Sequence, residues 1–126
     1  MPSNISFKIS LRLYCDDEIA MGPGKADLLD AIKIHGSISA AGRAMDMSYR
    51  RAWHLVDAMS RCWKEPLVAT SPGVAHGGGA LLTESGEKIL AHYRNLQARL
   101  DGYASCPDQT ALAQAMLDKP KLRQKS

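Results

Sequence analysis

The sequence lacks the cysteine and histidine patterns of a disulfide-stabilised or metal-binding protein. Its three cysteines, Cys15, Cys62 and Cys106, are widely spaced, and no Cys-x-x-Cys motif occurs. The four histidines have no metal-ligand spacing among themselves or with the cysteines. Because a disulfide framework needs paired cysteines and a zinc site needs closely spaced ligands, neither is expected. We predict reduced thiols, no bound metal and no cofactor.

Long apolar runs and catalytic motifs are missing too. No segment approaches the roughly 18 continuous apolar residues of a membrane span, and residues 1–10 do not have the pattern of a signal peptide. Residues 22–25 (GPGK) are no phosphate-binding loop, because Ile19 and Ala26 stand where that motif needs glycine and Ser or Thr. No nucleophile–base–acid set is recognisable. We therefore expect a cytoplasmic protein that makes no membrane contact and is not an enzyme.

What is present is a composition close to the globular average. Hydrophobic residues make up 45% of the chain and charged residues 23%, so a packed core is feasible. The formal net charge is +3, and residues 37–64 alone carry five basic and two acidic residues. We predict one domain over residues 1–100. Residues 101–126 are expected to be a partly disordered tail with one short helix over 109–117.

Hydrophobic periodicity and turn residues predict an α+β fold that is mainly helical. Strict apolar–polar alternation over residues 5–13 predicts a half-buried strand. Caps and helix-terminating residues predict four helices, over residues 25–35, a short segment capped by Ser37 or Ser39, 49–64 and 84–100. A hairpin is expected from strands at 67–71 and 80–82. The order β-α-α-α-β-β-α is typical of a winged helix-turn-helix domain.

The central helices have the features of a helix-turn-helix. Ala40 and Ala41 are small enough to let two helices cross closely, and Met47 is the apolar turn residue expected to fill the core. One face of the third helix is apolar and consists of Ala52, Val56, Met59 and Trp63. Trp53 lies at the edge of this face, where core packing is favoured over packing on DNA.

The opposite face of the third helix carries Arg50, His54, Asp57 and Arg61. The N-terminal residues of a recognition helix reach base edges, and arginine can bind guanine through two hydrogen bonds, so Arg50 is the first candidate for a base contact. Tyr49 and His54 suit a base edge or a phosphate, whereas Ser48 and Arg51 suit phosphates. The alternative for any single residue is a charged side chain that is merely solvated.

The hairpin tip is rich in glycine. Gly77 and Gly78 would let the backbone approach a phosphate or enter a minor groove, and His76 would add a contact. The alternative is a turn without a partner. Together, the expected DNA-binding residues are Ser48, Tyr49, Arg50, Arg51, Trp53, His54, Arg61, His76, Gly77 and Gly78.

Residues 28–90 resemble the N-terminal DNA-binding domain of ModE-type, molybdate-responsive regulators and, more distantly, the LysR-type helix-turn-helix. Besides the glycine run of the hairpin, the matching segments are Gly36-Ser37-Ile38-Ser39-Ala40-Ala41, Ser48-Tyr49-Arg50-Arg51-Ala52-Trp53 and Leu82-Thr83-Glu84-Ser85-Gly86. The resemblance implies that Tyr49, Arg50 and Trp53 lie on or beside the recognition surface. It also implies a homodimer in which the last long helix takes part.

The spacing along that helix fits such a dimer. Ile89, Tyr93, Leu96 and Leu100 repeat at intervals of four, three and four residues, as a helix–helix seam requires. Packing within the chain is the competing explanation, and both can hold.

The sequence thus predicts a transcription regulator that binds double-stranded DNA. Full-length ModE-type proteins carry C-terminal oxyanion-binding domains, for which this chain has no room. We therefore expect a stand-alone DNA-binding domain that acts constitutively, with a separate sensor protein, or in a changed role within molybdenum metabolism. The alternative is a protein-interaction or dimerisation module on the same fold that does not bind DNA.

Overall fold

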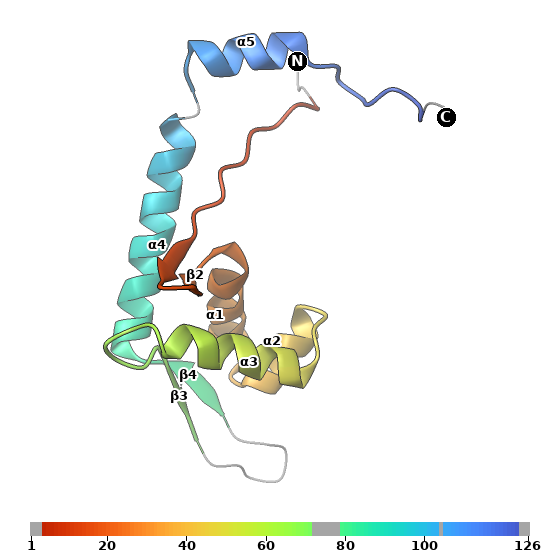
Figure 1. The fold of residues 1–126 in the computed structure, drawn as a ribbon. Helices are drawn as coiled ribbons and strands as arrows, with labels where there is room; N and C mark the ends of the chain where they lie inside the picture. The colour runs from red at the N-terminus through yellow and green to blue at the C-terminus, as the bar shows by residue number, and fades with distance from the viewer. Residues whose placement is uncertain (1–3, 72–78, 104, 124–126) are drawn as a thin grey trace.

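The computed structural model describes residues 4–71, 79–103 and 105–123. This part of the chain is mainly helical, with two small antiparallel sheets (Figure 1). Its elements are β1 (Leu13–Cys15), β2 (Glu18–Met21), α1 (Pro23–His35), α2 (Ile38–Ala44), α3 (Tyr49–Ser60), β3 (Val68–Thr70), β4 (Ala80–Leu82), α4 (Glu84–Tyr103) and α5 (Pro107–Ala115). The predicted α+β winged helix-turn-helix fold is confirmed.

The first three helices begin and end at the expected signals. Gly36 has a left-handed backbone (φ 76°) that closes α1, a conformation glycine adopts without strain. The Ser37 side chain accepts a hydrogen bond from the backbone N–H of Ala40 and caps α2. Ser48 caps α3 in the same way by accepting from the N–H of Arg51 at 3.1 Å.

A single hydrophobic core joins α1, α2 and α3 to the hairpin and to α4. Its largest fully buried side chains are Met21, Leu28, Leu29, Ile32, Met59 and Leu67. From the apolar face predicted for α3, Ala52, Val56 and Met59 are buried, and Trp63 is partly buried against the same core. Met47, the expected turn residue, is also partly buried there.

The hairpin is fixed to the helical body at its base. β3 and β4 pair antiparallel, with Val68 opposite Leu82 and Thr70 opposite Ala80. The N–H of Ala80 donates to the carbonyl of Gly36 at 2.7 Å, which ties β4 to the residue that ends α1. The wing therefore starts beside the helix-turn-helix unit.

The junction between the hairpin and α4 is close-packed. The Thr83 hydroxyl donates to the carbonyl of Pro66 at 2.6 Å and accepts from the N–H of Gly86 at 2.9 Å. The N–H of Thr83 donates to the carbonyl of Leu67. A Cβ on Gly86 would overlap that carbonyl oxygen, so only glycine fits here.

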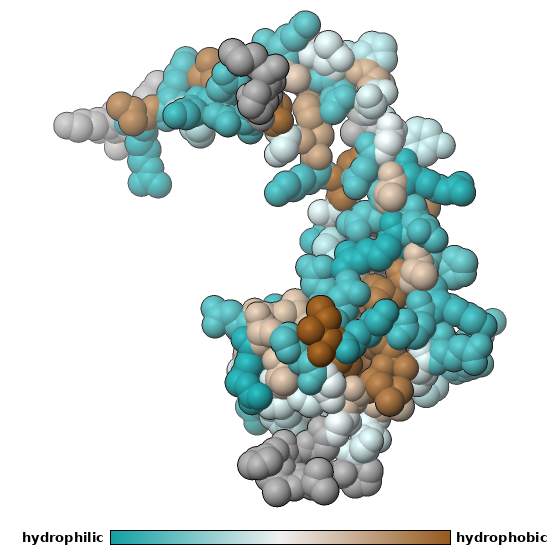
Figure 2. Space-filling view, turned by 180° about the vertical axis from the view of Figure 1, so that it is seen from behind, coloured by the Kyte–Doolittle hydropathy of each residue, from teal (hydrophilic) through white to brown (hydrophobic). Residues whose placement is uncertain are grey.

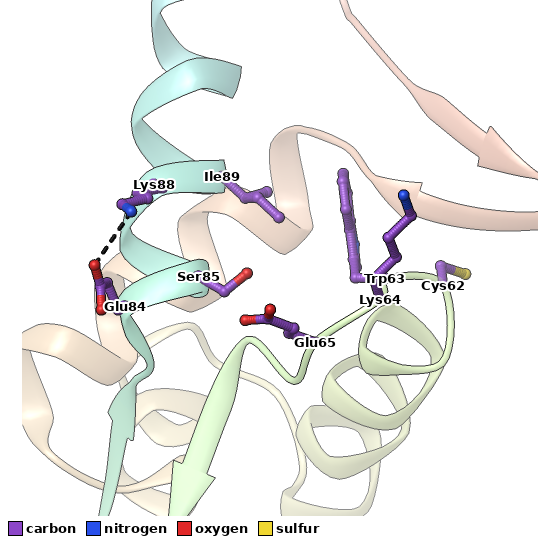
Figure 3. A pocket seen from close by; sticks show the side chains of 8 residues that line it. All are labelled: Cys62, Trp63, Lys64, Glu65, Glu84, Ser85, Lys88 and Ile89. Carbon is purple, nitrogen blue, oxygen red and sulfur yellow. Dashed lines mark ion pairs between the residues drawn. The ribbon is translucent and has the colours of Figure 1, made fainter.

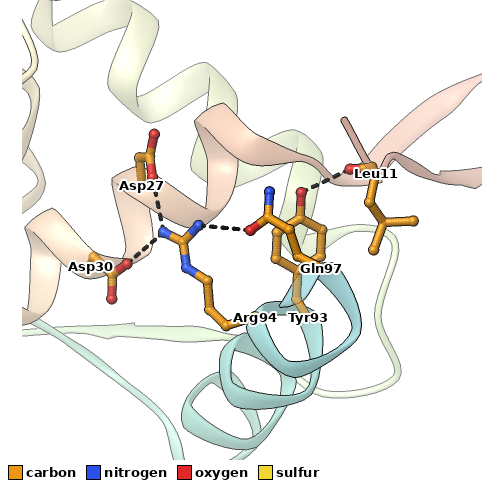
Figure 4. Close-up of polar contacts among 6 residues, drawn as sticks. All are labelled: Leu11, Asp27, Asp30, Tyr93, Arg94 and Gln97. Carbon is orange, nitrogen blue, oxygen red and sulfur yellow. Dashed lines mark hydrogen bonds and ion pairs between the residues drawn. The ribbon is translucent and has the colours of Figure 1, made fainter. Parts of the chain in front are cut away.

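Further along, α4 is bound to α1 and to the N-terminal segment (Figure 4). Nη2 of Arg94 lies 2.9 Å from a carboxylate oxygen of Asp27 and 2.7 Å from one of Asp30. The hydrogen bond with Asp27 contributes most to raising the pKa of the guanidinium, and the hydrogen bond with Asp30 adds to it. Tyr93 is buried, and its hydroxyl donates to the carbonyl of Leu11 at 2.8 Å.

The structure corrects the prediction for the N-terminal strand. Residues 5–12 are not in a strand, and β1 covers only Leu13–Cys15. β1 pairs with β2, a strand that was not predicted from the sequence. Alternation alone does not make a strand. The tight turn at Asp16 (φ 55°) brings β2 opposite β1, and the register joins Leu13 to Met21 and Cys15 to Glu18.

The third helix is also shorter than predicted, since α3 ends at Ser60 and not at residue 64. After the helix ends, Trp63 donates from its indole nitrogen to the carbonyl of Ala20 at 3.1 Å. The chain therefore leaves the helix, yet Trp63 still packs on the core.

An arm formed by α5 and the N-terminal segment lies away from this body, at the far end of α4 (Figure 1). Figure 2 shows the molecule as a C shape, with a wide opening between the arm and the body. The short helix expected near residues 109–117 is present as Pro107–Ala115. The division into a domain over residues 1–100 and a partly disordered tail stays a prediction.

Candidate nucleic-acid interface

The crossing of α2 and α3 depends on small residues. A Cβ added at Gly42 would stand 3.0 Å from the Cβ of Ala52, tighter than ordinary contact. Of the two alanines predicted at the crossing, Ala41 is buried and Ala40 is half-buried. Gly42 was missed by the sequence interpretation, although it continues the same run of small residues. The close crossing sets how far α3 stands out from the body.

The predicted reading face of α3 is exposed. The side chains of Arg50, Arg51, His54 and Asp57 all face solvent. Within the part of the chain that the structure describes, no ion pair or hydrogen bond engages the guanidinium of Arg50 or Arg51. Both groups therefore remain available to an anionic or hydrogen-bonding partner.

Arg61 differs from these two arginines. Its guanidinium lies 3.1 Å from a carboxylate oxygen of Asp57 and 3.6 Å from one of Glu18 on β2. These ion pairs join the C-terminal end of α3 to the β1–β2 hairpin. Its predicted use as a DNA contact would compete with them and stays a prediction.

The structure corrects the preferred role of Trp53. Its side chain is 38% exposed and does not pack in the core, because it lies off the stripe of Ala52 and Val56. It contacts Tyr49, one turn earlier, edge to face, with ring centroids 6.1 Å apart. The two rings and the side chains of Arg50, His54 and Asp57 line a shallow hollow of about 440 Å³ on this face of α3.

β4, at the base of the wing, packs against α1 and α4. Ser71 and Gly79 continue the pairing of β3 and β4 by one hydrogen bond of 2.9 Å. His76, Gly77 and Gly78, the residues predicted at the tip, lie outside the described residues. Their contact with DNA stays a prediction.

A second recess, of about 740 Å³, lies where the chain leaves α3 and enters α4 (Figure 3). Its wall includes Trp63, Glu65, Lys64 and Ile89, and Lys88 pairs with Glu84 at 3.1 Å on its rim. Charges of both signs line it, so it has no clear preference for an anion or a cation.

Cys62, at the edge of that recess, is not an activated thiol. Burial, followed by a hydrogen bond with Cys15, raises the pKa of its side chain. Its Sγ also donates to the carbonyl of Ala58 at 3.3 Å. Among the described residues, no group of three or more His, Cys, Asp or Glu side chains could hold a metal ion. The same residues contain no helix that is long and apolar enough to cross a membrane.

Comparison with curated proteins identifies relatives that are regulators and binding proteins. The chain is 46% identical over 78 residues to the molybdenum-pterin-binding protein MopB of Rhodobacter capsulatus, which covers 62% of this chain and 29% of that protein. It is 37% identical over 91 residues to the molybdenum transport protein ModE of Azotobacter vinelandii; the match covers 72% of this chain and 34% of that protein. It is 30% identical over 89 residues to the DNA-binding transcriptional dual regulator ModE of Escherichia coli, and this match covers 71% of this chain and 32% of that protein.

The chain thus spans about a third of the length of these relatives. No family model matches it. Among solved structures, a MarR family protein from Bacillus stearothermophilus is similar, with a TM-score of 0.51 and 20% identity over 75% of this chain and 69% of that one. This likeness supports the fold. The predicted resemblance to ModE-type proteins is confirmed.

Proposed function

We propose that this chain, a homologue of the ModE-type regulators, binds DNA sequence-specifically through α3 and regulates transcription in molybdenum metabolism. The observation that carries the proposal is the state of the N-terminal half of α3. Arg50 and Arg51 are exposed, and neither side chain is engaged by another of the described residues. Arg61 and Arg94 differ from them, because ion pairs engage their side chains.

The geometry assigns different tasks to the residues of α3. Arg50 projects from the first turn, where recognition helices reach base edges, and its guanidinium suits the two acceptors of guanine. Arg51 and Ser48 lie at the helix start and suit phosphates, which fix orientation without reading sequence. The close α2–α3 crossing at Gly42 holds this surface rigid. The wing, anchored through Gly36, would contact the adjacent backbone.

We further propose that the chain acts as a homodimer through α4. From the predicted seam, Leu96 is 43% exposed, Leu100 is half-buried and Ile89 is partly buried against the core. Tyr93 is instead buried within its own chain. Leu96 and Leu100 are therefore the residues best placed for a partner copy. A twofold dimer would read two half-sites about 34 Å apart, or a multiple of that distance.

The test is DNA binding measured by fluorescence anisotropy. The DNA would come from upstream of the chain's own gene and from molybdate-transport promoters, with unrelated DNA as competitor and salt varied. Wild type should bind tightly, resist the competitor and weaken as salt rises. Arg50→Ala should weaken specific binding by roughly 5- to 150-fold, the effect of losing one two-bond base contact. Arg99→Ala, which removes an exposed arginine from α4, is the matched control and should bind normally.

The competing function is a protein-interaction module without DNA binding. Equally weak binding to all DNA, with Arg50→Ala and Arg99→Ala indistinguishable, would overturn the proposal and favour that function. The outlying arm, with Leu112, Met116 and Leu117 exposed, would then be the first surface to examine.

A further inference from the structure

We propose that the shallow hollow lined by Tyr49 and Trp53 receives the 5-methyl group of a thymine, so that α3 reads an A·T pair beside the base that Arg50 reads. The inference rests on the proposed function, because it assigns a base to part of the same surface. It makes Tyr49 and Trp53 determinants of sequence specificity.

Two aromatic side chains outside the core cluster stand on one exposed face of α3. Trp53 is 38% exposed and Tyr49 is 59% exposed. Large aromatic surfaces in water are unfavourable, and such residues are enriched where a partner will cover them. The edge-to-face contact of the two rings orients them relative to one another on this face.

A second feature is the match between this hollow and the major groove. Every base edge in that groove offers hydrogen-bond donors or acceptors, and the thymine methyl is its one apolar group. The hollow has two aromatic walls, and Arg50 and His54 lie at its edge as donors for a neighbouring base. A thymine methyl packed against the rings would therefore leave Arg50 free to bind an adjacent guanine.

The sugar–phosphate backbone is the alternative occupant of the hollow. Neither aromatic ring carries a charge to pair with a phosphate, and the carboxylate of Asp57 in the same wall is already paired with Arg61. The basic groups that suit phosphates, Arg51 and the backbone near Ser48, lie at the helix start instead.

The experiment separates the methyl group from every other feature of thymine. Operators are first selected from a randomised DNA pool with the full 126-residue chain. Each thymine of the selected site is then replaced by deoxyuridine, which removes the methyl and keeps the base pair. We expect one position in each half-site at which this replacement weakens binding by about fourfold, the effect of one buried methyl. Other positions should show little change.

Protein variants then test whether Tyr49 and Trp53 cause that sensitivity. Trp53→Ala and Tyr49→Ala should weaken binding to the thymine operator and no longer distinguish it from the deoxyuridine operator. Thermal unfolding of both variants checks that they fold, since Trp53 is only 38% exposed and its loss removes some covered surface. Tyr103→Ala removes an exposed aromatic ring from the far end of α4 and should preserve the full methyl effect.

Each outcome is decisive. If the chain selects no sequence from the pool, the proposed function fails and the inference fails with it. If it selects an operator but deoxyuridine has no effect, or its effect survives in Trp53→Ala, the inference is wrong while DNA recognition stands. A uniform loss of affinity for all DNA in Trp53→Ala would assign the ring to the backbone and also overturn the inference.

Discussion

Replacing Gly86 by alanine should destabilise the protein even though alanine is the better helix former. A Cβ at this position would overlap the carbonyl oxygen of Leu67, a buried backbone group that also accepts from the N–H of Thr83. To relieve the overlap, α4 must move away from the hairpin. The movement strains the hydrogen bonds of the Thr83 hydroxyl to Pro66 and Gly86.

The magnitude follows from opposing contributions. Overpacking costs about 1–3 kcal/mol, and a weakened helix cap costs about 1 kcal/mol. The gain in helix propensity from glycine to alanine is at most about 1 kcal/mol. The net result is a loss of about 2 kcal/mol in the free energy of unfolding, or roughly 8 °C in Tm for a chain of this size.

The assay is urea unfolding followed by circular dichroism, with Gly102→Ala as the matched control. Gly102 lies near the other end of the same helix, and a Cβ there would meet nothing within 4 Å. Gly102→Ala should therefore be neutral or slightly stabilising. Equal stability of the two variants would refute the reasoning, because it would mean that the contact with Leu67 does not constrain α4.

Three further changes test other parts of the structure. Arg94→Met removes the link between α4 and α1 and leaves Asp27 facing Asp30. We expect the free energy of unfolding in urea to fall by about 1 kcal/mol, a small loss because the guanidinium is partly exposed. The control Arg99→Met should not change it measurably. Leu96→Glu places a charge on the exposed side of α4 and should convert the proposed dimer to monomer in light scattering, with the helical circular dichroism of wild type retained. A monomeric wild type would contradict the dimer proposal. Because the pKa of Cys62 is raised, its thiolate should form only at higher pH than that of an ordinary thiol. Maleimide should therefore label Cys62 more slowly at pH 7 than it labels exposed Cys106, and the difference between the two rates should narrow as pH rises. Equal labelling rates throughout would show that Cys62 is not shielded.

Local signals in the sequence predicted most of the helices and the hairpin. Ser37, Ser48 and Gly36 act on backbone groups within a few residues of themselves, so their effect is visible in the sequence alone. The apolar spacing of Ala52, Val56 and Met59 likewise reports which face of α3 is buried. The exposure of Arg50 follows from the same periodicity, because it lies on the opposite face.

Features that depend on distant neighbours were not predictable in this way. The alternation over residues 5–13 has the period of a strand, but β1 begins only at its last residue, where the chain turns back to pair with β2. The position of Trp53 at the edge of the apolar face allowed both core packing and exposure. Only the packing of α3 against the body decided that its ring is exposed, whereas its contact with Tyr49, one turn earlier, is local to the helix.

The sequence by itself therefore determined the order of the helices and of the hairpin after α3, the caps and the basic, exposed face of α3, because those properties arise from contacts within a few residues. The tertiary structure alone decided which small residues are indispensable and which charges are free. Gly42 and Gly86 matter because another segment lies against them, and Arg61 differs from Arg50 because Glu18, far away in the chain, is brought within reach.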